Sequence, residues 1–180
     1  MIHDTDLLDR LEALPVEHYA GNAFRATRQT LDPLVSSTNG GRWMPKGAAS
    51  VLYTSLSREG ALAEIAFYWS QLNPRPSKPA MLHTLRVSAK RTLKFVRADL
   101  RSLGVSNSEY STINPQRTQE IGAAVEFLGC HGLIAPSARW NCDHLILFPD
   151  RMDADSILEF VDSEIVDWIK WAANTGLTDK

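Results

Sequence analysis

Short apolar segments typical of β-strands alternate along this chain with longer segments that have helical spacing. The strand-like segments are 18–28, 50–56, 81–87, 93–96, 132–135, 144–148 and 157–161. The helical pattern is carried by 4–14, 57–72, 114–129 and a closing segment around Trp168 and Trp171. Because strands and helices are interleaved, the sequence predicts an α+β (mixed α/β) domain in which helices flank a central sheet.

Cap residues and prolines mark where these helices begin and end. The hydroxyl of Ser57 can cap the second helix, and Pro74 ends its pattern. Asn114 and Pro115 predict the cap and the first residue of the third helix, which Gly129 can end.

Length and charge narrow the class of protein. The 180 residues, 44% of them hydrophobic, correspond to one domain spanning 1–180, which can bury a core without disulfides or a metal. With 19 basic and 21 acidic residues, the net charge of −2 argues against direct binding to nucleic acid. No apolar run is long enough to span a membrane, and the first ten residues are acidic. We therefore expect a cytoplasmic protein that binds no membrane.

The segment 39–47, NGGRWMPKG, is the strongest candidate for a binding loop. Adjacent glycines allow positive φ and close approach to a ligand, and Arg42 and Lys46 supply positive charge. Arg42 can grip a diphosphate with two parallel hydrogen bonds, and Arg25 on the preceding strand can supply a second cation. A hairpin turn with solvated basic residues fits the same spacing.

Three further side chains have two interpretations each. Glu64 lies beside the apolar stripe of its helix, where it can face either a cleft or water. Tyr53, within an apolar strand, fits a plain core position as well as a site. Ser137, between two predicted strands, can bond either a ligand or its local backbone.

Cysteine and histidine residues near the last strands invite comparison with a zinc site. Cys130 and His131 are followed by Cys142 and His144, a spacing that lacks the close pairs of ordinary structural zinc sites. We therefore expect no metal.

Five motifs, taken in order, resemble the RES domain family. They are FRATR with Arg25, GGRW with Arg42, VLYTS with Tyr53, ALAEI with Glu64 and GLIAPSA with Ser137. The resemblance covers residues 19–149, so it implies a single RES-like domain. It also implies a fold like that of the diphtheria-toxin-like ADP-ribosyltransferases. Members of this family are typically NAD-consuming toxins of bacterial type II toxin–antitoxin pairs with an Xre-like antitoxin.

Carried over to this chain, the resemblance implies a role for each matching residue. Glu64 would be the key acid, acting with Arg42 and Tyr53 in catalysis, and Tyr53 would pack near the nicotinamide. Arg25 and Arg42 would hold the diphosphate and ribose side of NAD, and Ser137 would hydrogen-bond the ligand. Lys46 and Asn141 are possible supports, but we assign them no role.

The acceptor of the ADP-ribose stays open at this point. Water or phosphate would make the protein an NAD glycohydrolase or phosphorylase that depletes cellular NAD and arrests growth. A protein acceptor would make it a mono-ADP-ribosyltransferase that modifies a host metabolic protein. A non-catalytic module that binds a nucleotide or partner through its basic residues is a third possibility.

The expected partner is an Xre-like antitoxin that blocks the NAD cleft, within a multi-subunit complex implied by the resemblance. Trp168, Trp171, Ile165 and Ile169 form a terminal apolar patch that fits either core or an association surface.

Overall fold

The computed structural model describes residues 3–111 and 115–177 of the chain. Its strands are β1 (Val16–Arg28), β2 (Leu52–Ser55), β3 (Ala80–Lys94), β4 (Gly132–Pro136), β5 (Asp143–Leu147) and β6 (Ile157–Val166). Its helices are α1 (Thr5–Glu12), α2 (Arg58–Ser70), α3 (Arg97–Ser102), α4 (Asn107–Ser111), α5 (Gln116–Phe127) and α6 (Trp168–Asn174), with a 3-10 turn at Pro149–Arg151. The α+β fold class predicted from the sequence is confirmed.

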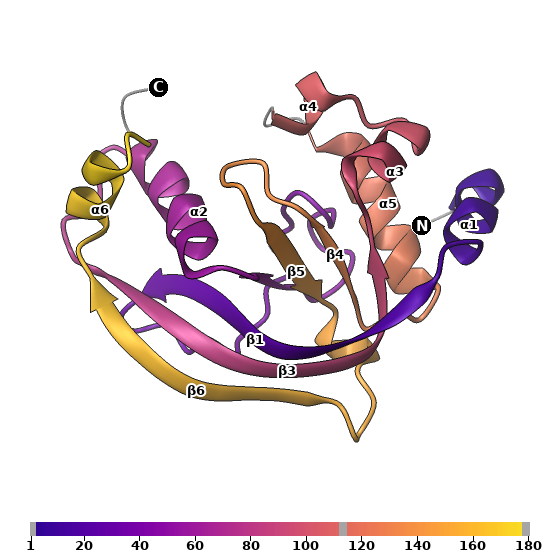
Figure 1. The fold of residues 1–180 in the computed structure, drawn as a ribbon, viewed down its shortest axis with the longest axis horizontal. Coiled ribbons are helices and arrows are strands. Elements are labelled where there is room, and N and C mark those ends of the chain that lie inside the picture. The colour runs from indigo at the N-terminus through magenta and orange to yellow at the C-terminus, as the bar shows by residue number, and fades with distance from the viewer. Residues whose placement is uncertain (1–2, 112–114, 178–180) are drawn as a thin grey trace.

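The strands form a strongly bent sheet that returns on itself. Their order is β1-β2-β5-β4-β3-β6, and β1 also pairs with β3, so five strands close a ring and β6 lies outside it. The β3–β4 pair is parallel and the other pairs are antiparallel. Figure 1 shows β1, β3 and β6 as three long ribbons curving together beneath the rest of the molecule.

The β3 strand is continuous, whereas the sequence predicted two strands separated by residues 88–92. Two buried residues, Ala89 and Thr92, flank the exposed Lys90 and Arg91, and the register with β1 shifts at this point. Pairing with β1 continues as far as Leu93, opposite Val16. The prediction of a break was wrong because the neighbouring strand keeps an otherwise weak segment extended.

Other differences from the prediction involve short or polar segments. The helices α3 and α4 have six and five residues and were not predicted. The strand β6 continues beyond residue 161 to Val166. Polar residues fit this part of the strand because it lies at the exposed edge of the sheet. Asp4 caps α1 and Ser57 caps α2. The predicted cap Asn114 lies outside the described residues.

Helices cover the two ends of the bent sheet. At one end α2 packs on α6, where the Trp69 and Trp168 rings meet edge-on at 5.5 Å. At the other end, α1 and α5 cover a core that includes Trp43, Phe95 and Phe148. Trp168 of the terminal apolar patch is core, whereas Ile165 and Ile169 are exposed. None of the described helices is long and apolar enough to cross a membrane.

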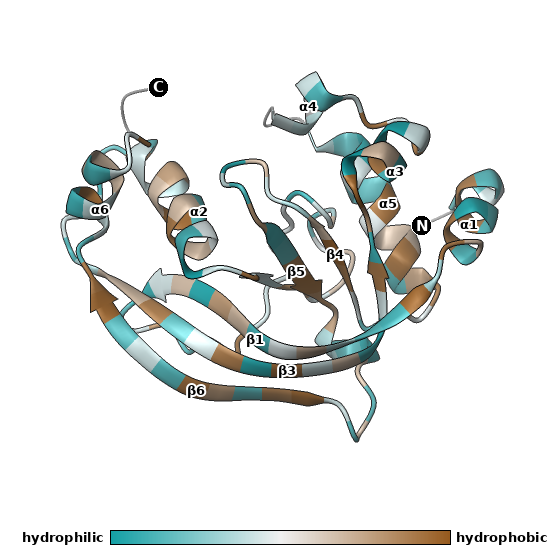
Figure 2. Ribbon diagram, in the orientation of Figure 1, coloured by the Kyte–Doolittle hydropathy of each residue, from teal (hydrophilic) through white to brown (hydrophobic). Residues whose placement is uncertain are grey.

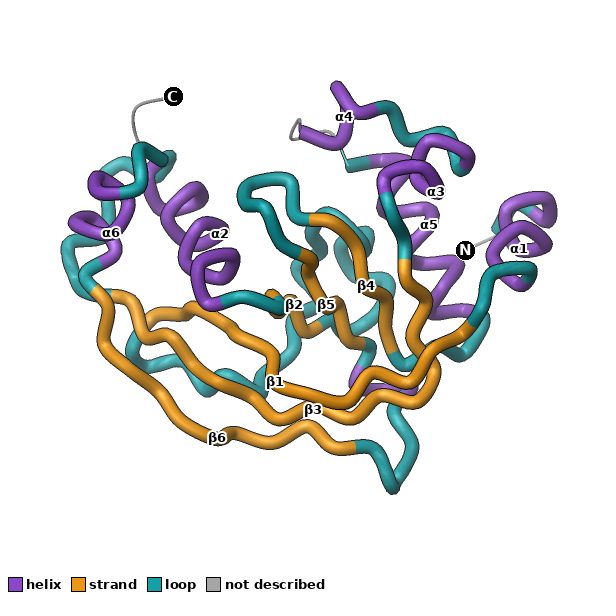
Figure 3. Tube along the Cα trace, in the orientation of Figure 1, coloured by secondary structure: helices purple, strands orange, loops and turns teal. Residues whose placement is uncertain are grey.

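The middle of the molecule changes from apolar to polar along β5. Figure 2 shows hydrophobic residues at the C-terminal end of β5 and hydrophilic ones at its start. The apolar Leu145, Ile146 and Leu147 are completely buried, and the strand begins with Asp143 and His144. In Figure 3, the loop between β4 and β5 rises between α2 and α4. The polar start of β5 therefore follows the loop that rises between α2 and α4.

Candidate active site

A cavity of about 710 Å³ opens beside the polar start of β5, within the size range of small-molecule sites. It is bounded by the end of β1, the 39–47 loop, β2, the inner face of α2 and His144. Four of the five predicted site residues line it, namely Arg25, Arg42, Tyr53 and Glu64. The structure therefore brings together side chains from four separate segments of the chain.

A glycine sets the position of α2 above β5. A Cβ atom on Gly60 would lie 2.3 Å from the Ser55 Oγ and 2.4 Å from the Cys142 Sγ. The turn before the helix is also tied to β5, since the Leu56 N–H donates to the Asp143 carbonyl at 2.9 Å. Glu64 lies one helical turn after Gly60, so the same close approach brings it to the cavity.

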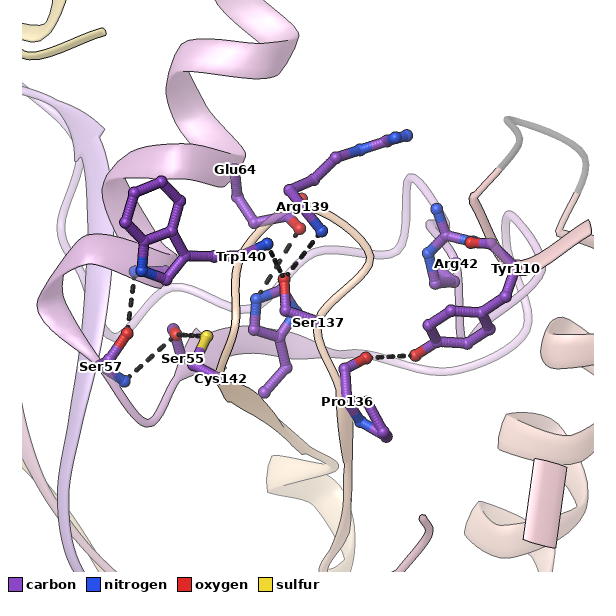
Figure 4. Close-up of polar contacts among 12 residues, drawn as sticks. Arg42, Ser55, Ser57, Glu64, Tyr110, Pro136, Ser137, Arg139, Trp140 and Cys142 are labelled. Carbon is purple, nitrogen blue, oxygen red and sulfur yellow. Dashed lines mark hydrogen bonds and ion pairs between the residues drawn. The ribbon is translucent and has the colours of Figure 1, made fainter. Parts of the chain in front are cut away.

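Glu64 lies among groups of opposite electrostatic effect. Burial raises the pKa of its carboxyl, and the positive charges of Arg139 and Arg42 oppose that rise. Its Oε1 lies 3.7 Å from the Nε2 of His144. Figure 4 shows the main-chain end of Arg139 near Glu64, with the Arg139 guanidinium extending away from the acid and Arg42 on the other side of the site. The acid is thus partly buried, and the charges of two arginines favour its ionised form.

The 39–47 loop makes a tight turn that presents Arg42. Gly40 has a φ of 78°, which favours glycine, and the Gly41 N–H donates to the Met44 carbonyl at 2.9 Å. Two side chains of α5 hold the loop: Thr118 donates to the Arg42 carbonyl at 2.7 Å and Gln119 to the Gly41 carbonyl at 2.8 Å. The loop is both a tight turn and a cavity wall.

The Arg42 side chain also contacts α4. Its Nη1 donates to the Tyr110 carbonyl at 2.7 Å, and its guanidinium lies 5.1 Å from the centroid of the Tyr110 ring. Arg97 lies 4.3 Å from the same ring. Arg42 is therefore held in place by the protein as well as facing the cavity.

Tyr53 belongs to both the core and the cavity. Its hydroxyl accepts the Trp43 N–H at 3.2 Å, and burial raises its pKa to about 12. A Cβ atom on Gly41 would come within 2.6 Å of that hydroxyl. The neutral phenol of Tyr53 thus supports the 39–47 loop from below.

Arg25 lines the cavity from β1 and also holds the next loop. Its Nη1 donates to the Pro33 carbonyl at 2.6 Å and to the Val35 carbonyl at 2.8 Å. Burial lowers the pKa of its guanidinium, which Asp32 partly offsets. Part of its hydrogen-bonding capacity is therefore used within the protein.

Ser137 is not among the described residues that line the cavity. It is 4% exposed, and its Oγ accepts the N–H groups of Arg139 at 3.0 Å and Trp140 at 3.1 Å (Figure 4). These bonds shape the β4–β5 loop that carries Arg139. The predicted ligand contact of Ser137 stays a prediction. Lys46 and Asn141 are exposed.

Sequence reasoning missed three residues of the site. Tyr68 lines the cavity one turn after Glu64, so helical spacing could have placed it there. His144 is a polar residue at the start of an apolar strand, which is a weaker signal. No sequence pattern pointed to Arg139. In the structure, its guanidinium lies 3.6 Å from the Phe67 ring centroid and donates to the Ser111 carbonyl at 3.0 Å.

The two cysteines do not join a metal cluster in the described part of the chain. No group of three or more potential ligands among His, Cys, Asp and Glu occurs there. Cys130 is buried, and the Cys142 Sγ lies 3.5 Å from the Ser55 Oγ.

Comparison with known proteins places the chain among its relatives. The model of the RES domain family matches residues 10–169. A chain of the crystal structure of the M. tuberculosis MbcT-MbcA toxin–antitoxin complex is similar, with a TM-score of 0.80 and 20% sequence identity. The match covers 98% of this chain and 99% of that one, and at this identity it shows a shared fold. No curated protein matches the sequence.

Proposed function

The chain belongs to the RES domain family, and from this membership and the cavity we propose that it is the toxin of a toxin–antitoxin pair that cleaves NAD. The bond broken is the one between nicotinamide and ribose. The M. tuberculosis structure with the same fold is a toxin–antitoxin complex, which supports the toxin assignment.

The observation that carries the proposal is the position of Glu64. When the glycosidic bond breaks, nicotinamide leaves with the bonding electrons and positive charge develops on the ribose. A carboxylate facing that sugar stabilises the transition state more than the ground state. Because Glu64 is partly buried, its charge is screened less than it would be in bulk water. Arg42 and Arg139 favour the ionised form that this role requires.

The remaining lining residues suit the other parts of NAD. We assign Arg42 and Arg25 to the diphosphate and ribose side of NAD, because one guanidinium group can donate two parallel hydrogen bonds to a phosphate group. Tyr53 and Tyr68 offer aromatic surface to a flat ring. Ser137 is assigned a hydrogen bond to the ligand; because its Oγ already accepts two N–H groups, its O–H would be the donor.

We place water or phosphate first as the acceptor of ADP-ribose, so that the reaction drains the cellular NAD pool. Transfer to a host protein is the second candidate. Restraint would come from an Xre-like antitoxin that covers the cavity, within the cytoplasm that both would share.

The test is NAD breakdown by the purified protein, free of its partner. NAD is measured by enzymatic cycling and nicotinamide release by chromatography. We expect Glu64→Gln to lower turnover by about 10²- to 10³-fold, since the lost group acts on developing charge. Glu59→Gln is the matched control, because Glu59 is an exposed acid on the same helix.

Each other outcome has a distinct meaning. Folded Glu64→Gln protein with full NAD turnover would refute the mechanism. Mass analysis that found ADP-ribose only on a protein would replace NAD breakdown by mono-ADP-ribosyltransfer. If folded Glu64→Gln still arrested growth, the chain would instead be a non-catalytic binding module.

A further inference from the structure

One buried polar atom beside the acid has no partner. The Nε2 of His144 is shielded from solvent and makes no hydrogen bond with any described residue. His144 is among the residues that line the cavity. The Oε1 of Glu64 lies 3.7 Å from this Nε2, which is too long for a hydrogen bond. An orphaned donor or acceptor in such a place is uncommon and calls for an explanation.

The fold itself aligns His144 with Glu64. Residues four apart on a helix and two apart on a strand are both separated by about 6 Å along their axes. Gly60 and Glu64 are four apart on α2, and Cys142 and His144 are two apart on the facing chain. The close approach of Gly60 to Cys142 therefore matches the approach of Glu64 to His144.

His144 is held firmly where it lies. It pairs with Ser55 of β2 on one side and with Ala135 of β4 on the other, so its strand is central in the sheet. The side chain that can adjust is Glu64, which extends from a helix by rotatable bonds. A small rotation would bring its Oε1 within hydrogen-bond distance.

Charge determines what His144 can offer. Burial, together with the nearby Arg42, lowers its pKa to about 4, so the ring is neutral at neutral pH. The contact with Glu64 is therefore no ion pair under those conditions. A neutral imidazole has one N–H, and the ring nitrogen that carries it is set by its neighbours. A carboxylate opposite Nε2 favours the proton on Nε2.

We propose that His144 is a positioning residue: its neutral Nε2–H donates to the Oε1 of Glu64 and leaves the other carboxylate oxygen to face the ligand. A rotation of the Glu64 side chain from the 3.7 Å contact closes this hydrogen bond, with or without a ligand. This assignment rests on the proposed function only for its effect on turnover, since the contact itself exists without NAD.

The alternative is that His144 merely fills space, and the chain contains a histidine to compare with it. His83 is 4% exposed and also has a ring nitrogen, Nδ1, without a partner among the described residues. Its Nε2 lies 2.8 Å from the Thr27 Oγ1, and it does not line the cavity described above. Substitutions at His83 therefore report the cost of altering a buried histidine away from Glu64.

The first experiment needs no variant. ¹⁵N NMR of the imidazoles in the wild-type protein at pH 7 distinguishes the two neutral tautomers. We expect the proton of His144 on Nε2. A proton on Nδ1 would overturn the proposal, because Nε2 would then be an acceptor facing an acceptor.

The second experiment follows the Glu64 carboxyl by ¹³C NMR across pH, with Glu64→Gln used to assign its signal. The groups facing this carboxyl are Arg42, Arg139, Tyr68, Tyr110 and His144. We expect His144→Leu to raise the Glu64 pKa by about one unit, because a donor to the charged form is lost. His144→Gln, which keeps an N–H donor, should restore most of the difference, and His83→Leu should change nothing. An unchanged Glu64 pKa in folded His144→Leu would overturn the proposal.

Turnover provides a separate readout. With NAD as substrate, His144→Leu should lower kcat about tenfold with little change in KM, the usual effect of losing a supporting partner. His144→Gln should recover most of the loss. If wild-type protein does not cleave NAD, the proposed function fails, while the two NMR experiments still decide whether His144 positions Glu64.

Discussion

The cavity has two walls that are built in different ways. The acid wall is α2 with Glu64, and the cation wall is the 39–47 loop with Arg42, backed by α5. Each wall depends on a helical glycine. A Cβ atom on Gly60 would meet the ends of the Ser55 and Cys142 side chains, whereas a Cβ atom on Gly122 would lie 1.8 Å from the Trp43 main-chain oxygen.

The two walls also differ in their hydrogen bonds. Side chains of α5 bond two main-chain carbonyls of the cation wall, which fixes the path of the loop. At the acid wall, Glu64 and His144 stand 3.7 Å apart without a hydrogen bond. The cation wall is thus held by hydrogen bonds, whereas the acid wall contains a contact that is longer than a hydrogen bond.

The largest effect on stability should come from breaking the cation wall. Gly122→Ala forces a methyl group into the Trp43 carbonyl, which is main chain and belongs to a residue buried in the core. We expect the unfolding free energy to fall by about 3 kcal/mol or more, measured by urea denaturation. Stability equal to wild type would show that the two elements can separate, which contradicts the rigid wall.

The acid wall should make stability depend on pH. The folded chain resists protonation of His144 down to about pH 4, whereas the unfolded chain takes up that proton near pH 6.5. The unfolding free energy should therefore drop as pH falls from about 6.5 to 4, by about 2 to 3 kcal/mol from this group. The raised pKa of Glu64 acts in the opposite sense, since it favours proton binding by the folded chain above pH 4.5.

His144→Gln removes the loss of stability that protonation of His144 causes. The denaturation curves of this variant at pH 7 and pH 5 should therefore differ less than those of wild type. Parallel behaviour of the two proteins would show that His144 is protonated in the folded chain.

A smaller effect on stability, with a larger one on activity, is expected from Gly60→Ala. The added methyl group pushes α2 away from two short side chains, but the helix gains about 1 kcal/mol in propensity. We expect a net loss of about 1 to 2 kcal/mol and a fall in NAD turnover that exceeds it, because Glu64 moves with the helix. The comparison fails if Gly122→Ala proves the milder of the two substitutions.

The smallest effect should come from Ser137→Ala, at about 1 kcal/mol. Two N–H groups of the β4–β5 loop lose their acceptor, which loosens Arg139 near Glu64. Isothermal titration with NAD, in a Glu64→Gln background that turns NAD over slowly, separates two roles. A loss of affinity beyond about tenfold would support a direct ligand contact, and a smaller change would indicate that Ser137 mainly shapes the loop.

Local signals along the chain were sufficient for most elements. Ser57 predicted the start of α2, alternation predicted β3 over its first half, and glycines predicted the tight turn at Arg42. Family membership followed from five short motifs whose order and context are visible without a structure. These features succeed because a cap, a turn or a period depends on residues only a few positions apart.

Tertiary structure decided the contacts of the site. The 15-residue β3 is held extended by its pairing with β1, and the β4–β5 loop brings the positive charge of Arg139 near enough to α2 to act on Glu64. The hydroxyl of Ser137 is already bonded to its own loop, and His144 meets Glu64 through strand register and the close packing at Gly60. Such contacts join segments far apart in the chain, and a one-residue change of register would turn a strand's side chains to the other face. The sequence by itself therefore determined which residues are available for chemistry, and only the packed sheet and helices decided which of them meet.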